Sequence, residues 1–128
     1  MKYELKKENK PTLSTYGKYK AVACHDRTIG GKQLLKEVSE RSTLSEGTVT
    51  AVVWQLAQVI NRHLREGDRV RLQDFGLMKL EIESDKVEQA ADFKPQKHIR
   101  GVRLHFLPES IKGRPELYDG IKFVKKRQ

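Results

Sequence analysis

Residues 65–82, REGDRVRLQDFGLMKLEI, combine the end of a helix with two short strands. Gly67 is expected to end the helix, because glycine accepts the left-handed backbone that follows many helix C-termini. Polar and apolar side chains alternate over residues 69–72 and again over residues 78–83, which is the period of a half-buried strand. Phe75-Gly76 lies between the two strands and predicts a sharp reversal or a bulge.

Two helices are expected upstream of this stretch. Apolar residues recur at helical spacing over residues 32–41, and a longer helix is expected at 46–66 with Ser45 as its N-cap. Apolar side chains cover more than one face of the longer helix, so it is expected to be buried on more than one face. In a chain of 128 residues the second face most simply packs against another subunit, which predicts a homodimer. A helix–turn–helix that reads the major groove is the alternative for residues 32–66, but few polar residues precede Asn61.

Three further segments complete the chain. Residues 84–101 are polar and low in apolar side chains, and a long loop in a small domain is usually functional. Residues 102–107 alternate again and predict a returning strand. Residues 1–28 show two short alternating patterns separated by loop-forming residues, which predicts a two-stranded appendage that must pack on the core.

These motifs resemble the HU and integration host factor family of bacterial histone-like, DNA-bending proteins. The segment GDRVRLQDFGLMKL at 67–80 is similar to the family's GxxVxLxxFGxF-like pattern, and Phe106-Leu107-Pro108 is similar to its F-x-P motif. About thirty residues separate the two motifs, roughly the length of the family's DNA-gripping arm. The longer chain resembles the HU-like group common in the Bacteroidetes.

The resemblance implies an α+β, HU-like fold that is dimeric. A helix pair would precede a three-stranded antiparallel sheet with a protruding β-arm. The alternation within residues 1–28 adds extra β-strands at the N-terminus. The expected organisation is an N-terminal β appendage at 1–28, an HU-like DNA-binding domain at 29–120 and a basic C-terminal strand or tail at 121–128.

Charge indicates a polyanionic partner, such as DNA, RNA or an anionic membrane surface. The net charge is +9 and the pI about 9.7. Residues 1–29 carry +4 and residues 109–128 carry +3, whereas residues 30–76 and 77–108 carry +1 each. No apolar run approaches the length of a membrane span, no signal segment is visible, and the single Cys24 fits a reducing compartment. We therefore expect a cytoplasmic, nucleoid-associated protein.

The resemblance, the strand alternation and the distribution of charge together suggest which residues contact DNA. The apolar surface of the longer helix, with the resemblance, suggests which residues form the dimer core. The expected DNA-binding residues are Arg69, Arg71, Lys79, Phe93, Lys94, Pro95, Lys97, Arg100, Arg103, Lys122, Lys125, Lys126 and Arg127. Phe93 and Pro95 lie near the tip of the arm, where they either wedge between base steps or shape the turn of the arm itself. The expected dimer core contains Val53, Trp54, Leu56, Phe75 and Phe106.

We expect a nucleoid-associated homodimer that binds double-stranded DNA largely without sequence specificity and bends it. No catalytic pair, metal spacing or complete phosphate loop is apparent, so no enzyme activity, cofactor, small-molecule substrate or membrane partner is expected. One feature departs from the family: the outgoing limb of the arm carries five carboxylates, which repel phosphates. The alternative function is accordingly an HU-fold scaffold that binds a protein partner and has no DNA role.

Overall fold

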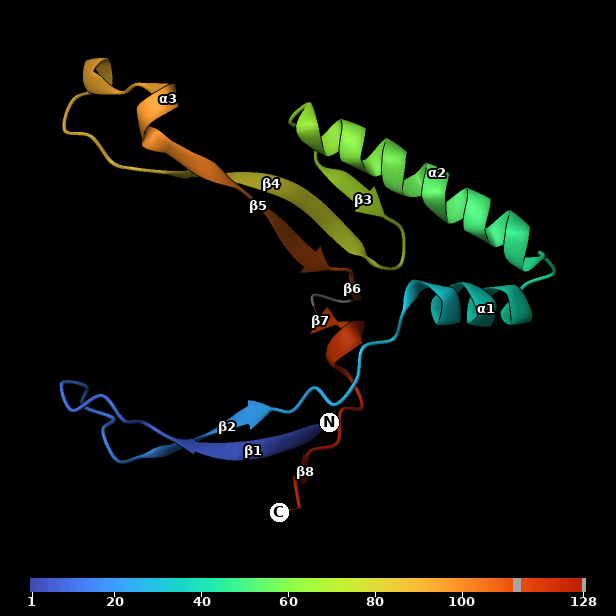
Figure 1. Ribbon diagram of the computed structural model, residues 1–128, viewed down its shortest axis with the longest axis horizontal. Helices are drawn as coiled ribbons and strands as arrows, with labels where there is room; N and C mark the ends of the chain where they lie inside the picture. Colours follow the sequence, from blue (N-terminus) through green and yellow to red (C-terminus); the bar gives the residue numbers. More distant parts are fainter. Residues whose placement is uncertain (112–113, 128) are drawn as a thin grey trace.

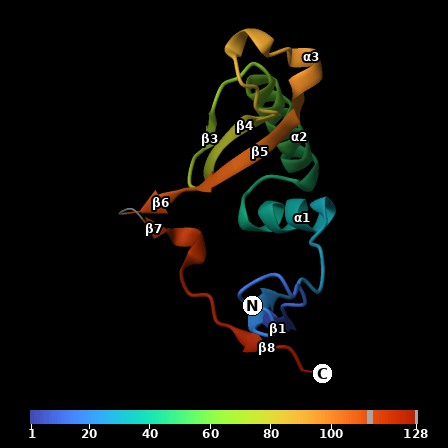
Figure 2. The same ribbon diagram turned by 90° about the vertical axis from the view of Figure 1, so that its left-hand side faces the viewer.

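The computed structural model describes residues 1–111 and 114–127, and its secondary structure is mixed α and β, as predicted. In chain order the elements are β1 (Lys2–Lys7), β2 (Tyr19–Ala23), α1 (Gly31–Arg41), α2 (Glu46–Arg65), β3 (Val70–Leu72), β4 (Gly76–Ser84), the 3-10 helix η1 (Ala90–Asp92), α3 (Pro95–His98), β5 (Ile99–Pro108), β6 (Ser110–Ile111), β7 (Arg114–Pro115), the 3-10 helix η2 (Glu116–Tyr118) and β8 (Val124–Lys125). Helices α1 and α2 and the sheet β3-β4-β5 lie together, and the sheet β2-β1-β8 lies apart from them (Figures 1 and 2).

Both long helices begin and end within one residue of the positions that the sequence indicates. Ser45 caps α2 as expected: its side-chain oxygen accepts a hydrogen bond of 3.2 Å from the Thr48 N–H. At the other end Gly67 adopts a φ of +93°. The Gly67 and Asp68 N–H groups bond to the carbonyls of Leu64 and His63, which is the paired pattern of a Schellman cap. This cap turns the chain directly into β3.

The reversal expected between β3 and β4 is present, but glycine is needed at position 76 for a different physical reason. Asp74 rather than Gly76 adopts the positive φ, +64°, and aspartate tolerates this region better than most residues with a Cβ. A Cβ added at Gly76 would lie 2.5 Å from both the Leu107 carbonyl oxygen and the ring of Phe106. Glycine is therefore required at 76 by close approach to β5, not by its own backbone angle.

Strands β4 and β5 form a long antiparallel pair that extends beyond β3 and α2 (Figure 1). Their register pairs Met78 with Phe106 and Leu80 with Leu104 on the apolar side. The pairing ends at Ser84 and Ile99. The connection is not a continuous β-arm, because residues 85–98 include the helical turns η1 and α3.

The two strands predicted near the N-terminus are confirmed as β1 and β2, which pair antiparallel. Strand β8 adds to β1 in parallel, so two segments far apart in the sequence share one sheet. Figure 2 shows this sheet connected to the rest of the structure by two chain segments, one before α1 and one after β7. The alternating patterns within residues 1–28 and 121–128 gave no indication that the two segments pair.

Very little of the single chain is buried. Among the described residues, Val49 and Leu64 of α2 are the only hydrophobic side chains classed as buried, at 3% and 7% exposure. Ile82 and Trp54 are 64% and 59% exposed. No helix in the described part of the chain is both long and apolar enough to cross a membrane. Burial this slight leaves the apolar faces of α2 and of the β4-β5 pair without a cover.

Candidate nucleic-acid interface

The polar side of the β4-β5 pair holds two of the expected DNA contacts, Lys79 and Arg103. Register pairs Lys79 with His105 and Glu81 with Arg103. Paired residues project to the same side of a sheet, and neighbours along a strand project to opposite sides. These four side chains therefore share the side opposite Met78 and its apolar neighbours, as the alternation predicts.

Glu81 lies at the centre of this polar side. Its carboxylate is 3.4 Å from the Arg103 guanidinium, 3.7 Å from His105 Nδ1 and 3.8 Å from Lys79 Nζ. Arg103 also lies 3.9 Å from Glu83. Ion pairs this exposed contribute little to stability, but they neutralise cations that would otherwise face phosphates.

Two further expected contacts are also paired with carboxylates. Arg71 binds Glu109 through both Nε and Nη2, and Arg100 Nε binds Asp85. The hydrogen bond with Glu109, together with its Coulomb attraction, raises the pKa of Arg71. The same hydrogen bond lowers the pKa of Glu109, although partial desolvation opposes it. Both shifts favour the charged forms, so both groups are charged at neutral pH.

Three of the expected cations have no ion pair among the described residues: Arg69, Lys94 and Lys97. Arg69 immediately precedes β3, and Lys94 and Lys97 are exposed at or near the tip of the arm. Pro95 is the first residue of α3, where its fixed φ suits a helix start.

Phe93 is half-buried, and its ring centroid lies 5.4 Å from that of His98. The Lys94 N–H donates a 2.9 Å hydrogen bond to His98 Nδ1. His98 was not among the predicted residues, and nothing in the polar stretch around it distinguished it from a loop residue. These contacts give Phe93 a part in the folded tip, so insertion between bases requires it to leave His98.

The four cations at the C-terminal end of the sequence lie elsewhere. Lys125 belongs to β8, and Lys122, Lys126 and Arg127 flank that strand. Strand β8 lies in the β2-β1-β8 sheet, away from the β4-β5 arm (Figure 1). The structure therefore divides the expected DNA-binding residues between two separate sheets.

The residues expected in the dimer core are largely exposed in the single chain. Val53, Trp54, Leu56 and Phe75 are exposed by 42%, 59%, 40% and 55%. Phe106 is half-buried, and its ring centroid lies 4.9 Å from that of Phe75. Phe75 and Phe106 thus pack against each other within one chain, while α2 presents an uncovered apolar surface.

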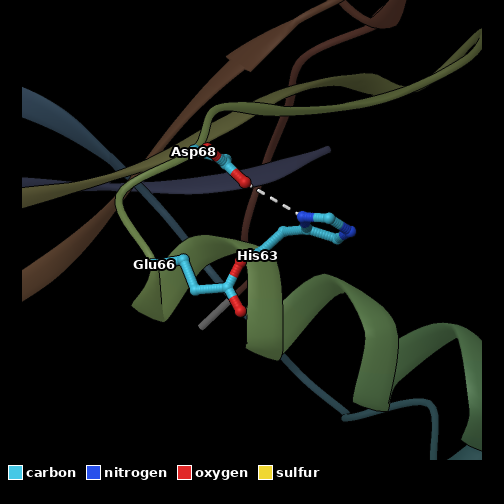
Figure 3. A group of neighbouring side chains, drawn as sticks. All are labelled: His63, Glu66 and Asp68. Carbon is cyan, nitrogen blue, oxygen red and sulfur yellow. Dashed lines mark hydrogen bonds and ion pairs between the residues drawn. The ribbon is translucent and has the colours of Figure 1, made fainter.

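One group of side chains at the end of α2 has ligand atoms at metal-binding distances (Figure 3). The ligand atoms of His63, Glu66 and Asp68 all lie within 4.8 Å of one another, and His63 Nδ1 is 3.0 Å from Asp68 Oδ2. Imidazole nitrogen and carboxylate oxygen are both zinc ligands. The cap at Gly67 accounts for the grouping without a metal, because it turns Asp68 back toward His63.

Nine chains of solved structures match this one, and a comparison with curated proteins found no match. One solved structure is a protein from Bacteroides vulgatus ATCC 8482, provisionally described as a bacterial DNA-binding protein. Its TM-score is 0.60 at 11% sequence identity, and the match covers 98% of this chain and 48% of that one. The likeness shows a shared fold, and this chain spans about half the length of its neighbour.

A family model shows the class to which this chain belongs, the proteins with an HU domain. Residues 1–115 match the HU-HIG family model, described as an HU domain fused to a wHTH, Ig or glycine-rich motif. The chain belongs to this family, and the resemblance to HU proteins is confirmed. The match starts at residue 1, so it includes β1 and β2, which the sequence motifs alone did not relate to the family.

Proposed function

We propose that this chain is a DNA-binding protein of the HU type that acts as a homodimer. It binds double-stranded DNA largely without sequence specificity, bends it, and works with the nucleoid in the cytoplasm. The single observation that carries the proposal is membership of the HU-HIG family over residues 1–115. A net charge of +9 and a structural neighbour described as DNA-binding support it.

The exposed apolar surface supports the dimer. A chain with two buried hydrophobic side chains among its described residues has too small a core to offset the entropy lost on folding. A second copy packed on Val53, Trp54 and Leu56 would enlarge that core. Dimerisation would also place two β4-β5 arms on one assembly, so that both could contact the same duplex.

In mechanism, cations on each arm and on each β2-β1-β8 sheet would neutralise phosphates and release counterions. The energy of bending would be offset by the longer path of contact that a bent duplex allows. Each segment has its own role: residues 29–120 form the dimer that bends DNA, and residues 1–28 and 121–128 add positive charge. The proposal includes no catalytic step.

A salt titration of binding tests this function. Full-length protein is mixed with straight, nicked and pre-bent duplexes of equal length, and the dissociation constant is measured over a range of salt concentrations. The function predicts tighter binding to nicked and pre-bent duplexes, whose deformation costs less, and a linear fall of log affinity with log salt. Equal affinity for all three duplexes would count against bending, and no binding at low salt would rule out the DNA role.

The ion pairs on the arm favour a second candidate function. Arg71, Lys79, Arg100 and Arg103 are each held by a carboxylate, so the β3-β4-β5 sheet and its arm present a mixed-charge surface of the kind that proteins recognise. In this candidate the HU fold is a scaffold for a protein partner. The titration distinguishes the two, because a scaffold has no reason to prefer nicked or bent duplexes.

A further inference from the structure

Nearly all of the net charge of this chain belongs to the two segments that form the β2-β1-β8 sheet and its flanks. Residues 1–29 carry +4 and residues 121–127 carry another +4, whereas residues 30–120 carry +1 of the total of +9. The two basic segments are far apart in the sequence, and pairing of β8 with β1 brings them together. One small sheet therefore concentrates the positive charge of the molecule.

The register sorts the side chains of this sheet onto two sides. Lys6 lies directly opposite Lys20, and Lys2 lies on the same side because it is four residues from Lys6 on the same strand. The alternation continues to Lys126, whose N–H bonds to the Tyr3 carbonyl just beyond β8. Glu4 also projects to this side, between Lys2 and Lys6 on β1. We call Lys2, Lys6, Lys20 and Lys126 the lysine face.

The opposite side of the sheet is apolar at its centre and carries Lys7 and Lys125 at its ends, because register pairs Lys7 with Tyr19 and Lys125 with Tyr3. Met1, Tyr3, Leu5, Ala21, Ala23 and Phe123 line a shallow groove of about 530 Å³ there. A basic side opposite an apolar side is also the pattern of a surface that lies on an anionic membrane, so anionic vesicles belong in the test. Membership of the HU-HIG family favours duplex DNA, a polyanion with an extended charged surface, as the partner.

The lysine face is incompletely neutralised within the chain. Lys2 lies 3.3 Å from Asp26 and Lys6 lies 3.6 Å from Glu4. Lys20 and Lys126 have no carboxylate within 4.0 Å among the described residues. Like charges directly opposite each other on paired strands are destabilising, as for Lys6 and Lys20, and an anion bound between them removes that repulsion.

We propose that the lysine face, rather than the β4-β5 arm, makes the main contact with the phosphates of duplex DNA. This assignment rests on the proposed function. Lys2 and Lys6 stand roughly 13 Å apart on an extended strand, a span that covers several phosphates, because duplex charges recur about every 1.7 Å of axis. Each surface has both paired and unpaired cations, but residues 77–108, which include the arm, carry five acidic residues and a net charge of only +1.

Two variants with equal changes in charge test the assignment in the full-length protein. The lysine-face variant combines Lys2→Gln, Lys6→Gln, Lys20→Gln and Lys126→Gln. The arm variant combines Lys79→Gln, Lys94→Gln, Lys97→Gln and Arg103→Gln. Thermal melting confirms that both fold, and the slope of log affinity against log salt is measured with one straight duplex. Each lost phosphate contact reduces the magnitude of the slope by about 0.9, so the lysine-face variant should lose up to about 3.6 per subunit.

The arm variant is expected to lose clearly less than the lysine-face variant. An equal or larger loss in the arm variant, or an unchanged slope in the lysine-face variant, would overturn the assignment while leaving the DNA-binding function intact. Failure of the unmodified protein to bind any duplex would overturn both. Vesicles of phosphatidylglycerol and a duplex RNA of the same length serve as competitors. Tighter binding to either of them that depends on the lysine face would assign the face to that partner and overturn its assignment to DNA.

Discussion

Glu81 is the single residue with the greatest influence on the charge of the arm. Its carboxylate lies within 4.0 Å of Lys79, Arg103 and His105. One acidic group thus pairs with three side chains that could otherwise bind phosphates. We predict that Glu81→Gln strengthens DNA binding and steepens the salt dependence by about 0.9 for each cation that gains a phosphate. A salt titration by fluorescence anisotropy measures both quantities.

Glu37→Gln is a matched control for this change. Glu37 lies on α1, has no ion pair among the described residues, and its replacement alters the net charge by the same amount. If both variants bind DNA equally well, the local pairing at Glu81 is irrelevant and only total charge matters.

The Arg71–Glu109 pair gives a pH prediction. Hydrogen bonding to Arg71 lowers the folded-state pKa of Glu109, so the pair contributes stability above the unfolded-state pKa and loses it as pH falls through the folded-state value. NMR titration of the Glu109 carboxyl should give a midpoint below that of an ordinary glutamate, and Arg71→Gln should raise it. An unchanged titration midpoint of Glu109 in the Arg71→Gln variant would show that the pair does not persist in solution.

Among the helices and strands, α2 has the clearest need of a partner, because it leaves apolar side chains exposed in the single chain. Val53 and Leu56 are about 40% exposed on a helix whose apolar residues extend past one stripe. We predict that Val53→Asp dissociates the dimer and destabilises the fold by several kcal/mol, because it buries an unpaired charge at the subunit interface. Sedimentation at micromolar concentration reads the change directly.

Gln58→Asp introduces the same charge on the polar stripe of α2 and should leave the dimer intact. A stable, folded monomer of the unmodified protein at micromolar concentration would show that α2 needs no second subunit. The exposed apolar side chains would then require another cover.

The tip of the arm makes a different prediction. If Phe93 and Pro95 wedge into the duplex, changing both to alanine should reduce the bend far more than the affinity for straight DNA. His98→Ala is the informative comparison, because it removes the ring that Phe93 contacts but keeps Phe93 itself. Bending that falls equally in both variants would indicate that Phe93 shapes the tip and does not insert. Energy transfer between dyes at the two ends of a duplex reports the bend.

At the scale of the whole molecule, local patterns predicted the elements well, because their causes are local. Ser45 and Gly67 mark the ends of α2 through hydrogen bonds to residues within five positions. Alternation placed Lys79 and Arg103 on one side of the sheet for the same reason. Gly76 was located correctly, but its cause is contact with Phe106 and Leu107, about thirty residues away, which no local pattern reveals.

Long-range pairing explains most of what the sequence left out. A two-residue strand such as β8 has too little pattern of its own to show that it joins β1. The partners of the arm cations depend on register, so Glu81 and Glu109 could not be assigned from composition. The helical turns around Phe93 and His98 arise in a polar stretch where apolar periodicity is absent.

The central claim is that this HU-domain chain bends duplex DNA as a dimer. Energy transfer across a short duplex labelled at both ends, measured at saturating full-length protein, tests it most directly. The proposed function predicts a rise in transfer efficiency that saturates at two chains per duplex and falls back when salt is added. Saturable binding without any change in transfer would contradict bending and leave a protein that coats straight DNA.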